Sequence, residues 1–443
     1  MNAKARQTIV LVFAPSAYPL GGVQTWLDYL LPGLREKRLD VRLALTESEF
    51  HNPHTYLSFH PALKHIPLFV LKGDNSSQLS RLKVIKSLIT KVKPDVCITV
   101  NMVDVFQAVN ELRSEGKTET RLISTLHGVH AGMLAMLQHY RDQLDSVIST
   151  NRLTQALVTK KAGVPQSRSL YAPYGVEPPA KRLKAKKTKL SIAYVGRFEE
   201  DQKRVDDLLT ILSLSLVDID NLEIHLAGDS EQPVVRAWMS KHQQYAKQII
   251  DHGVLTPLEL VESVYKQADI LLLTSEWETG PIVAWEAMAH QLTLVCSRYI
   301  GSQHEGSLVH QHNCLMFDIG DCKEALKQIK KLQDTNLRHT LNANALSLVE
   351  QKYTCSRSIS SWYQCIEQTL ALEPLSIFFT ENIGKDKGRL NAVFNKLMGH
   401  RGDWAANLAR KIIGKSSNSV DENSDWPHSY RPGKDSLVDL SEL

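Results

Sequence analysis

Two series of short β-branched runs alternate along this chain with longer segments of helical periodicity. The first series has strand-like runs at 8–14, 41–45, 95–100 and 121–127, with helical patterns at 23–37 and 79–92 among them. The second series has runs at 190–196, 222–228, 268–275 and 292–297. Because such alternation builds βαβ units, each series predicts an α/β, doubly wound sheet with helices on both faces. A length of 443 residues also favours two domains over one core.

A polar, basic stretch separates the two series. Residues 180–189, "AKRLKAKKTK", contain six Lys or Arg and follow "VEPP", which is typical of a linker. We therefore predict a first Rossmann-like domain at 1–180, a linker at 181–189 and a second Rossmann-like domain at 190–357. Open parallel sheets bind ligands at the carboxyl ends of their strands, so the two sheets are expected to face an interdomain cleft.

The composition indicates a soluble globular protein. Apolar residues make up 43% and charged residues 23%, and a net charge of +4 on this length gives no argument for nucleic acid as a partner. The six cysteines form no CxxC pair, which favours reduced thiols and a cytoplasmic protein. The apolar run at 8–14 is read as a first strand rather than a signal peptide, and we find no apolar run of membrane-spanning length.

The strongest motif is "SEWETGPIVAWEAMA", at residues 275–289. Gly280 and Pro281 mark a loop that turns into a helix, so Glu278 belongs to the loop after a strand and Glu286 to the helix that follows. Gly280, Pro281 and Ile282, which lie between the two glutamates, are candidate donor-binding residues with them. Two carboxylates there can accept hydrogen bonds from vicinal hydroxyls of a sugar or ribose. The alternative is a pair of solvated helix carboxylates, which the strand–loop–helix context disfavours.

A second motif, "VGRFEEDQKRVDDLL", covers residues 195–209. Gly196 closes a strand, and Arg197 and Lys203 flank an acidic loop before a helix, an arrangement suited to a diphosphate. Gly228, in "LAGDS", closes a third strand on the same side. Taken alone, the two cations would be read as ordinary surface charges.

Together these pieces resemble the retaining, GT-B-type glycosyltransferases of family 4, among the group 1 glycosyltransferases, over about residues 8–370. The resemblance matches Glu278 and Glu286 to an E-x7-E motif, in which the first lies by the hydroxyls of the donor sugar and the second grips the nucleotide ribose. Arg197 and Lys203 would hold the donor diphosphate and neutralise its charge as it leaves, the work a metal does elsewhere. No cofactor and no metal are therefore expected.

The resemblance also assigns roles in the first domain. Gly21 and Gly22 match a glycine-rich turn whose backbone amides approach the donor phosphate and sugar, and Gln24 would reach an acceptor hydroxyl. His127, in "STLHGVHAG" at the end of the expected fourth strand, matches a histidine that contacts the donor sugar, and His130 is a second candidate on the acceptor side. The alternatives are that Gly21 and Gly22 form an ordinary turn and that His127 has a structural role.

Several residues depart from the pattern of the family. Arg204, Gln291 and Cys314 stand where glycine is usual. Thr293 and Tyr174 replace a proline and an asparagine, whereas Gly301 and Glu305 are retained. These changes leave every proposed charged contact in place, but they put the identity of the base and of the sugar in doubt.

The histidines of "HNPHTYLSFHPALKH", at residues 51–65, have irregular spacing. That spacing favours solvated loop residues over a metal site.

The end of the chain extends beyond the family pattern. Residues 350–372 resemble the terminal helix that crosses back onto the first domain, and we place the crossover at 358–372. The extension 373–443 contains a basic amphipathic segment at 385–415 and an acidic, flexible tail at 416–443. The amphipathic face either lies on an anionic membrane surface, near a lipid-linked acceptor, or docks on the protein body, and docking is favoured.

The sequence therefore predicts a metal-independent hexosyltransferase that uses a UDP- or GDP-sugar donor and retains the anomeric configuration. Its acceptor would be a glycan or lipid-linked molecule in surface polysaccharide or glycolipid synthesis, in the cytoplasm or on the inner face of the membrane. His127, Arg197, Lys203 and Glu278 are the expected catalytic residues. The rival predictions are a nucleotide-sugar epimerase on the same fold and a non-catalytic binding protein.

Overall fold

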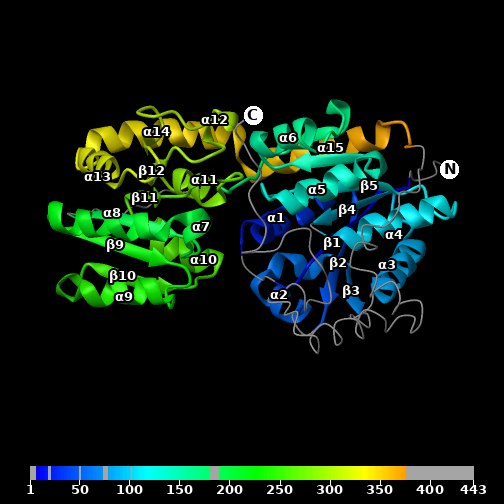
Figure 1. Ribbon diagram of the computed structural model, residues 1–443, viewed down its shortest axis with the longest axis horizontal. Coiled ribbons are helices and arrows are strands. Elements are labelled where there is room, and N and C mark those ends of the chain that lie inside the picture. The colour runs from blue at the N-terminus through cyan, green and yellow to red at the C-terminus, as the bar shows by residue number, and fades with distance from the viewer. Residues whose placement is uncertain are drawn as a thin grey trace, which may run out of the picture. The chain divides into compact units, whose positions relative to one another are not determined.

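The computed structural model describes residues 6–17, 21–48, 51–72, 78–100, 102–179 and 189–375, which form two compact units (Figure 1). Unit 1 comprises the chain up to Ala172 and resumes at Ile359, whereas unit 2 comprises Pro173–Ser358. Apart from Lys189, the predicted linker lies outside the described residues. So do the predicted amphipathic segment 385–415 and the tail 416–443.

Unit 1 contains a parallel sheet with the strand order β3-β2-β1-β4-β5-β6-β7. Its strands are β1 Ile9–Ala14, β2 Asp40–Glu47, β3 Leu68–Lys72, β4 Val96–Val100, β5 Arg121–Leu126, β6 Ser146–Ser149 and β7 Ser169–Tyr171. The four predicted runs are present, but β3, β6 and β7 were missed because they are short and lie toward the sheet edges. His127 consequently follows the fifth strand, and its assignment to the fourth was wrong.

The helices of unit 1 cover this sheet, and the end of the described chain returns to them. They are α1 Gly22–Glu36, α2 Pro53–Phe59, α3 Gln78–Val92, α4 Val103–Ser114, α5 Ala131–Tyr140 and α6 Arg152–Lys160, with the short turns η1 Pro61–His65, η2 Arg141–Gln143 and η3 Gln166–Arg168. Helix α15, Cys355–Ala371, begins in unit 2 and continues into unit 1. There the buried Trp362 packs on Trp26 of α1, with ring centroids 4.8 Å apart.

Unit 2 contains a second parallel sheet, with the order β10-β9-β8-β11-β12-β13. Its strands are β8 Leu190–Val195, β9 Leu222–Ala227, β10 Ile249–Gly253, β11 Ile270–Leu273, β12 Thr293–Ser297 and β13 Leu315–Phe317. The sheet grows in one direction from β8 to β10 and in the other from β11 to β13. The reversal lies between β8 and β11, which is where doubly wound sheets bind ligands.

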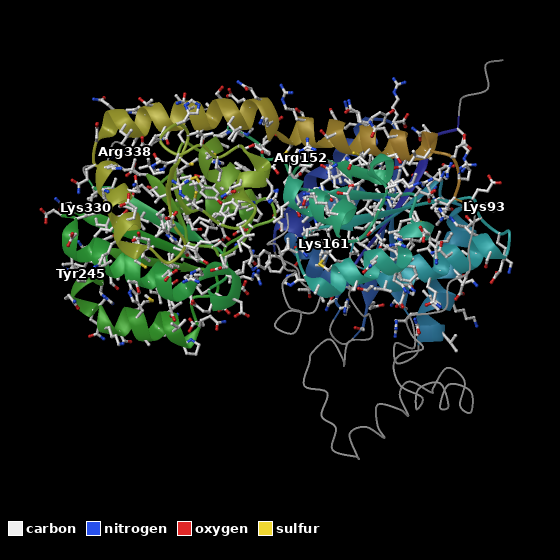
Figure 2. The ribbon with its side chains drawn as sticks, turned by 45° about the horizontal axis from the view of Figure 1, so that its top comes forward. Lys93, Arg152, Lys161, Tyr245, Lys330 and Arg338 are labelled. Carbon is white, nitrogen blue, oxygen red and sulfur yellow. The ribbon has the colours of Figure 1, made fainter. Side chains whose placement is uncertain are left out.

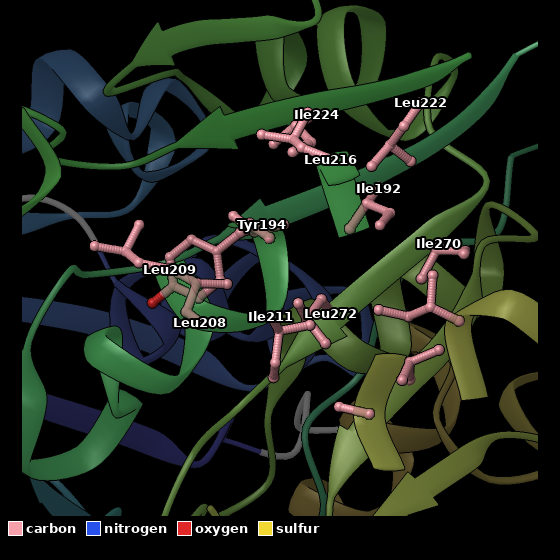
Figure 3. Packing of buried hydrophobic residues seen from close by; sticks show 14 of the residues in the cluster. Ile192, Tyr194, Leu208, Leu209, Ile211, Leu216, Leu222, Ile224, Ile270 and Leu272 are labelled. Carbon is pink, nitrogen blue, oxygen red and sulfur yellow. The ribbon is translucent and has the colours of Figure 1, made fainter. Parts of the chain in front are cut away.

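Both faces of this sheet are buried. Alternate residues of the central strands, such as Ile192, Ile224 and Leu272, point into one hydrophobic cluster with Leu208 of the following helix α8 (Figure 3). The intervening residues, including Leu271, are buried as well. Burial on both faces explains why these strands read as continuous apolar runs in the sequence.

The helices of unit 2 supply the cover. They are α7 Glu200–Lys203, α8 Val205–Asp218, α9 Pro233–Lys241, α10 Pro257–Leu260, α11 Ile282–Ala289, α12 Ser302–Glu305, α13 Cys322–Lys331 and α14 Thr335–Lys352, with the short turns η4 Gln243–Tyr245 and η5 Val261–Tyr265. Several start at a side-chain cap: Thr256 and Glu259 form a reciprocal capping box at α10, and Asp321 accepts a hydrogen bond from the backbone N–H of Glu324 at α13.

Two departures from the family pattern coincide with left-handed backbone. Arg204 has φ 50° and Gln291 has φ 62°, a region that glycine enters at little cost and other residues at about 1–2 kcal/mol. Arg204 offsets this strain through ion pairs with Asp207 at 2.5 Å and with Glu276 at 2.8 Å. The left-handed backbone therefore explains why the family pattern has glycine at both positions.

The histidines of residues 51–65 are not all solvated, so that expectation was wrong in part. His51 and His60 are almost fully buried. The Nδ1 of His51 lies 2.5 Å from Oγ1 of Thr46, and the Nδ1 of His60 lies 2.6 Å from Oδ2 of Asp28 on α1. Their hydrogen bonds to unit 1 make them part of its packing.

The outer helices of unit 2 carry basic side chains, including Lys330 of α13 and Arg338 of α14 (Figure 2). Lys330 pairs with Asp218 at 3.1 Å and Lys327 with Glu324 at 3.1 Å, so these lysines form solvated ion pairs.

Within the described part of the chain, no helix combines the length and apolar character needed to cross a membrane.

The packing of α15 on unit 1 can be tested at Gly33 of α1. A Cβ added at Gly33 would overlap Cδ1 of Ile359 and lie 2.7 Å from its Cγ1. Although Gly→Ala usually stabilises a helix, Gly33→Ala should lower the free energy of unfolding by about 1–3 kcal/mol. Adding Ile359→Ala should make the double variant more stable than the sum of the two single changes, as measured by urea denaturation. Strict additivity would contradict this contact.

Candidate functional site

Two glycines follow neighbouring strands of unit 2. Gly196 follows β8 with φ 154°, and Gly228 follows β9 with φ 152°. The N–H of Gly196 donates to the carbonyl of Ala227 at 3.0 Å. A Cβ on Gly228 would overlap the carbonyl oxygen of Gly196. The two bare backbones therefore touch at the carboxyl edge of the sheet, as the sequence predicted for strand ends.

Arg197 and Lys203 lie at either end of the segment that follows Gly196. The carbonyl of Arg197 accepts a 2.5 Å hydrogen bond from the Tyr194 hydroxyl. Its guanidinium, 61% exposed, donates to Glu199 at 2.7 Å and to the side-chain oxygen of Gln202 at 2.8 Å. Lys203 ends α7, and its side chain is only 14% exposed. One cation therefore faces solvent and the other is nearly enclosed.

Lys203 meets the first predicted glutamate directly. Its Nζ lies 2.6 Å from Oε1 of Glu278, whose side chain is 6% exposed and belongs to the loop after β11. The Ser275 hydroxyl donates to the same oxygen at 2.6 Å, and Nε2 of Gln202 lies 3.5 Å from the other oxygen. The structure thus joins a predicted cation and a predicted carboxylate that are 75 residues apart in sequence.

Backbone contacts fix these two loops to each other. The Thr274 hydroxyl donates to the carbonyl of Lys203 at 2.7 Å. The N–H of Glu276 donates to the carbonyl of Gln202 at 2.8 Å, and the Glu276 side chain pairs with Arg204. Because the loops follow β8 and β11, this cluster occupies the point where the strand order reverses.

Glu286 has a different partner from Glu278. It lies on α11. This helix follows Gly280, which has φ 91°, and Pro281, which is its N-cap residue. Its Oε2 accepts a 2.7 Å hydrogen bond from the Tyr265 hydroxyl. Burial raises the pKa of the Glu286 carboxyl, and the hydrogen bond from Tyr265 opposes that rise. The Tyr265 ring also stacks on His290, so this carboxylate has a defined orientation.

The sequence did not predict Gln202 and Ser275, which contact this cluster, or Tyr265, which binds Glu286. Ser275 stands in the quoted motif and Gln202 is adjacent to Lys203, so a search for polar neighbours of the motif residues would have found them. Tyr265 lies in the π-helical turn η5, about twenty residues before Glu286, and its role depends on tertiary packing.

The predicted glycine pair of unit 1 stands at the start of a helix. Gly21 is the N-cap of α1 with φ 145°, and both Gly21 and Gly22 are exposed. Gln24 lies in the first turn, where its Oε1 would be 2.9 Å from a Cβ added at Gly21. The helix N-terminus presents backbone N–H groups, which suit an anion. The roles assigned to these three residues stay predictions.

His127 follows β5 and packs against α1. Its ring lies 5.0 Å from that of Trp26, and its Nε2 lies 2.9 Å from Oγ1 of Thr125. Burial lowers the pKa of His127 to about 3, so its imidazole is neutral at physiological pH. His130 is buried at the N-cap of α5. A neutral His127 can exchange hydrogen bonds with a hydroxyl, but its sugar contact and the role of His130 stay predictions.

Among the described residues, no group of three or more His, Cys, Asp or Glu side chains is arranged to hold a metal ion. Metal independence of the chain stays a prediction.

Comparison with known proteins bears on unit 2 first. Residues 189–335 match the sequence profile of the family described as Glycosyl transferases group 1. This domain belongs to the group 1 glycosyl transferases. The resemblance predicted from the sequence is thus confirmed at the level of the group, and membership of family 4 stays a prediction.

A curated relative and two solved structures extend the comparison. Lipopolysaccharide 1,6-galactosyltransferase of Salmonella typhimurium is 25% identical over 223 residues, covering 47% of this chain and 57% of that protein. The apo lipopolysaccharide outer core galactosyltransferase WaaB shares 15% identity with a TM-score of 0.62 over 82% of this chain and 99% of its own. Anabaena HepE with UDP and glucose shares 16% identity with a TM-score of 0.64 over 82% and 100%.

These similarities differ in what they establish. The chain spans little more than half the length of the curated relative, and the structures are too distant in sequence to show more than the fold. The predicted α/β, GT-B fold class, with two Rossmann-like domains, is confirmed.

The close approach of the two glycines predicts a large effect of a single methyl group. Gly228→Ala combines a backbone strain of about 1–2 kcal/mol with overlap on the Gly196 carbonyl, and should destabilise unit 2 by about 3 kcal/mol. Gly253→Ala is the matched control, since Gly253 has φ 62° but open space around it, and should cost only the strain. Chemical denaturation measures both, and equal losses would contradict the contact.

The lowered pKa of His127 predicts a pH effect on stability. In the unfolded chain its imidazole takes up a proton below about pH 6.5, whereas in the folded chain it stays neutral down to about pH 3. Stability should therefore fall as the pH drops from 7 to 4. His127→Gln should make this fall shallower, as measured by melting temperature across that range. Parallel profiles for the two proteins would show that His127 protonates as easily when folded.

Proposed function

We propose that the chain is a glycosyltransferase that moves a hexose-type sugar from a nucleotide diphosphate donor to a glycan or lipid-linked acceptor. The observation that carries this proposal is the Lys203–Glu278 contact beside Arg197, Gly196 and Gly228, in a group 1 glycosyl transferase domain. A cation and bare backbone suit a diphosphate, and a carboxylate suits the hydroxyls of a sugar. Their presence at one sheet edge therefore suits a ligand that contains both, a sugar diphosphate.

The donor diphosphate would be bound by Lys203 and Arg197. The Lys203 ammonium carries three protons, so it can bridge a Glu278 oxygen and a phosphate oxygen at the same time. As the bond between the sugar and the diphosphate breaks, negative charge grows on the diphosphate, and two cations held beside it lower the energy of that state. A diphosphate oxygen would then take the proton of the incoming hydroxyl, with retention of the anomeric configuration.

The two carboxylates would recognise hydroxyl groups. Glu278, which pairs with Lys203, would accept hydrogen bonds from the hydroxyls of the donor sugar. Glu286, oriented by Tyr265, would accept them from the ribose of the nucleotide. UDP is the donor nucleotide we favour, because HepE was solved with UDP and glucose, and GDP is the alternative.

The relative from Salmonella supports an acceptor in a surface polysaccharide, since its name places it in lipopolysaccharide synthesis. A nucleotide-sugar epimerase would instead release an altered free sugar from the donor alone. A binding protein would hold the nucleotide without turnover.

A donor panel tests this proposal. The full chain is titrated with UDP and GDP, and then with UDP-glucose, UDP-galactose, UDP-N-acetylglucosamine and GDP-mannose, with and without extracted lipopolysaccharide core as acceptor. We expect micromolar binding of one nucleotide, and its release only when acceptor is present. The anomeric proton of the product, read by NMR, should match the configuration of the donor.

Variants assign the contacts. Lys203→Met and Glu286→Ala should each weaken nucleotide binding about tenfold or more, because each removes a hydrogen bond to a charged group. His127→Ala should spare binding and lower turnover. Lys323→Met, on the exposed face of α13, is the matched control for loss of one positive charge. Absence of binding to both nucleotides at millimolar concentration would reject the proposal, and release of altered sugar without acceptor would favour the epimerase.

A further inference from the structure

We infer that Gln202 is a positioning residue that couples the diphosphate-binding cation Arg197 to the sugar-binding carboxylate Glu278. This inference rests on the proposed function and deepens it. Gln202 is 8% exposed and lies in the short helix α7, between the two predicted cations. None of the roles assigned above includes it.

The side-chain amide of Gln202 makes contacts in two directions. Its Oε1 accepts a 2.8 Å hydrogen bond from Nη2 of Arg197. Its Nε2 donates to the carbonyl of Trp277 at 3.2 Å and lies 3.5 Å from Oε2 of Glu278. One planar group thus touches a residue after β8 and two residues of the loop after β11.

The backbone of Gln202 prevents the amide from moving away. Its carbonyl accepts a 2.8 Å hydrogen bond from the N–H of Glu276, and the next carbonyl, of Lys203, accepts one from Thr274. A buried side chain on an anchored backbone has few alternative rotamers. The position of its amide is therefore set by the fold before any ligand arrives.

The contacts require an amide. Arg197 needs an acceptor and the Trp277 carbonyl needs a donor, and the terminal amide of glutamine provides both on one planar group. A carboxylate at this position would keep the acceptor but lose the donor, and it would add a negative charge beside Glu278. An alkyl chain of similar length would lose both contacts.

This geometry links the two halves of a nucleotide sugar. Arg197 is 61% exposed, and among the described residues its side chain would keep the contact with Glu199 alone if Gln202 were lost. Glu278 keeps Lys203 and Ser275 without Gln202, but the oxygen that faces the amide loses its partner. Gln202 therefore fixes the position of the phosphate-binding cation Arg197 relative to Glu278, the carboxylate that binds the sugar.

Two variants separate these contacts in the full chain. Isothermal titration measures the affinity for UDP and for UDP-glucose, or for GDP and GDP-mannose if the chain prefers GDP. Their ratio gives the contribution of the sugar. Gln202→Glu should leave the affinity for the nucleoside diphosphate within about threefold and reduce the sugar contribution about tenfold. Gln202→Met should reduce the affinity for both ligands about tenfold.

The control is another buried glutamine on a helix of unit 2. Gln328 of α13 is 2% exposed and donates to Glu324, so Gln328→Glu also adds a charge beside a carboxylate. It should lower the melting temperature without changing either affinity.

Three results would overturn the inference. The first is wild-type affinities in both Gln202 variants. The second is a loss of sugar contribution in Gln328→Glu equal to that in Gln202→Glu, since that would reflect stability alone. The third is failure of the wild-type chain to bind any of the four ligands, which would reject the proposed function as well.

Discussion

The contact between Lys203 and Glu278 is the interaction around which the candidate site of unit 2 is arranged. Removing both charges from water is costly, and the pair is retained only because the remaining lone pairs are used. Ser275 and Gln202 complete the shell of the carboxylate. The pair joins the loop after β8 to the loop after β11 across the strand reversal, together with the contacts of Thr274 and Glu276. Such an ion pair is weak evidence for stability, and its place at the strand reversal is what makes it part of a candidate site.

The backbone around this pair is unusually constrained. A side chain at Gly228 would overlap the carbonyl of Gly196, while Arg204 accepts a left-handed conformation that glycine would adopt freely. Arg204 uses the side chain it gains to bind Glu276, two residues before Glu278. Arg204 thus costs the strain of a left-handed backbone, which glycine would avoid, and adds an ion pair between the same two loops. The Lys203–Glu278 pair is present beside this additional contact.

The sequence predicts the long buried strands and the two-domain division because burial on both faces leaves a continuous apolar pattern. It does not predict β6 or β7, whose four and three residues are too short to show a period. Glu278 and Lys203 can be predicted from their motifs, but their contact cannot, because 75 residues separate them. Tyr265 lies outside every motif, and its hydrogen bond to Glu286 arises only from packing.

The two units share a strand order and differ in the chemistry at the reversal. In unit 2 the order 3-2-1-4 brings charged side chains to the strand ends, whereas the same order in unit 1 brings the exposed N-terminus of α1 there. His127 packs on Trp26 of that helix and is held neutral by burial. At these strand ends, ion pairing thus characterises unit 2, and an exposed helix N-terminus and a neutral imidazole characterise unit 1. The same strand order therefore presents a charged loop cluster in one unit and an exposed helix N-terminus in the other.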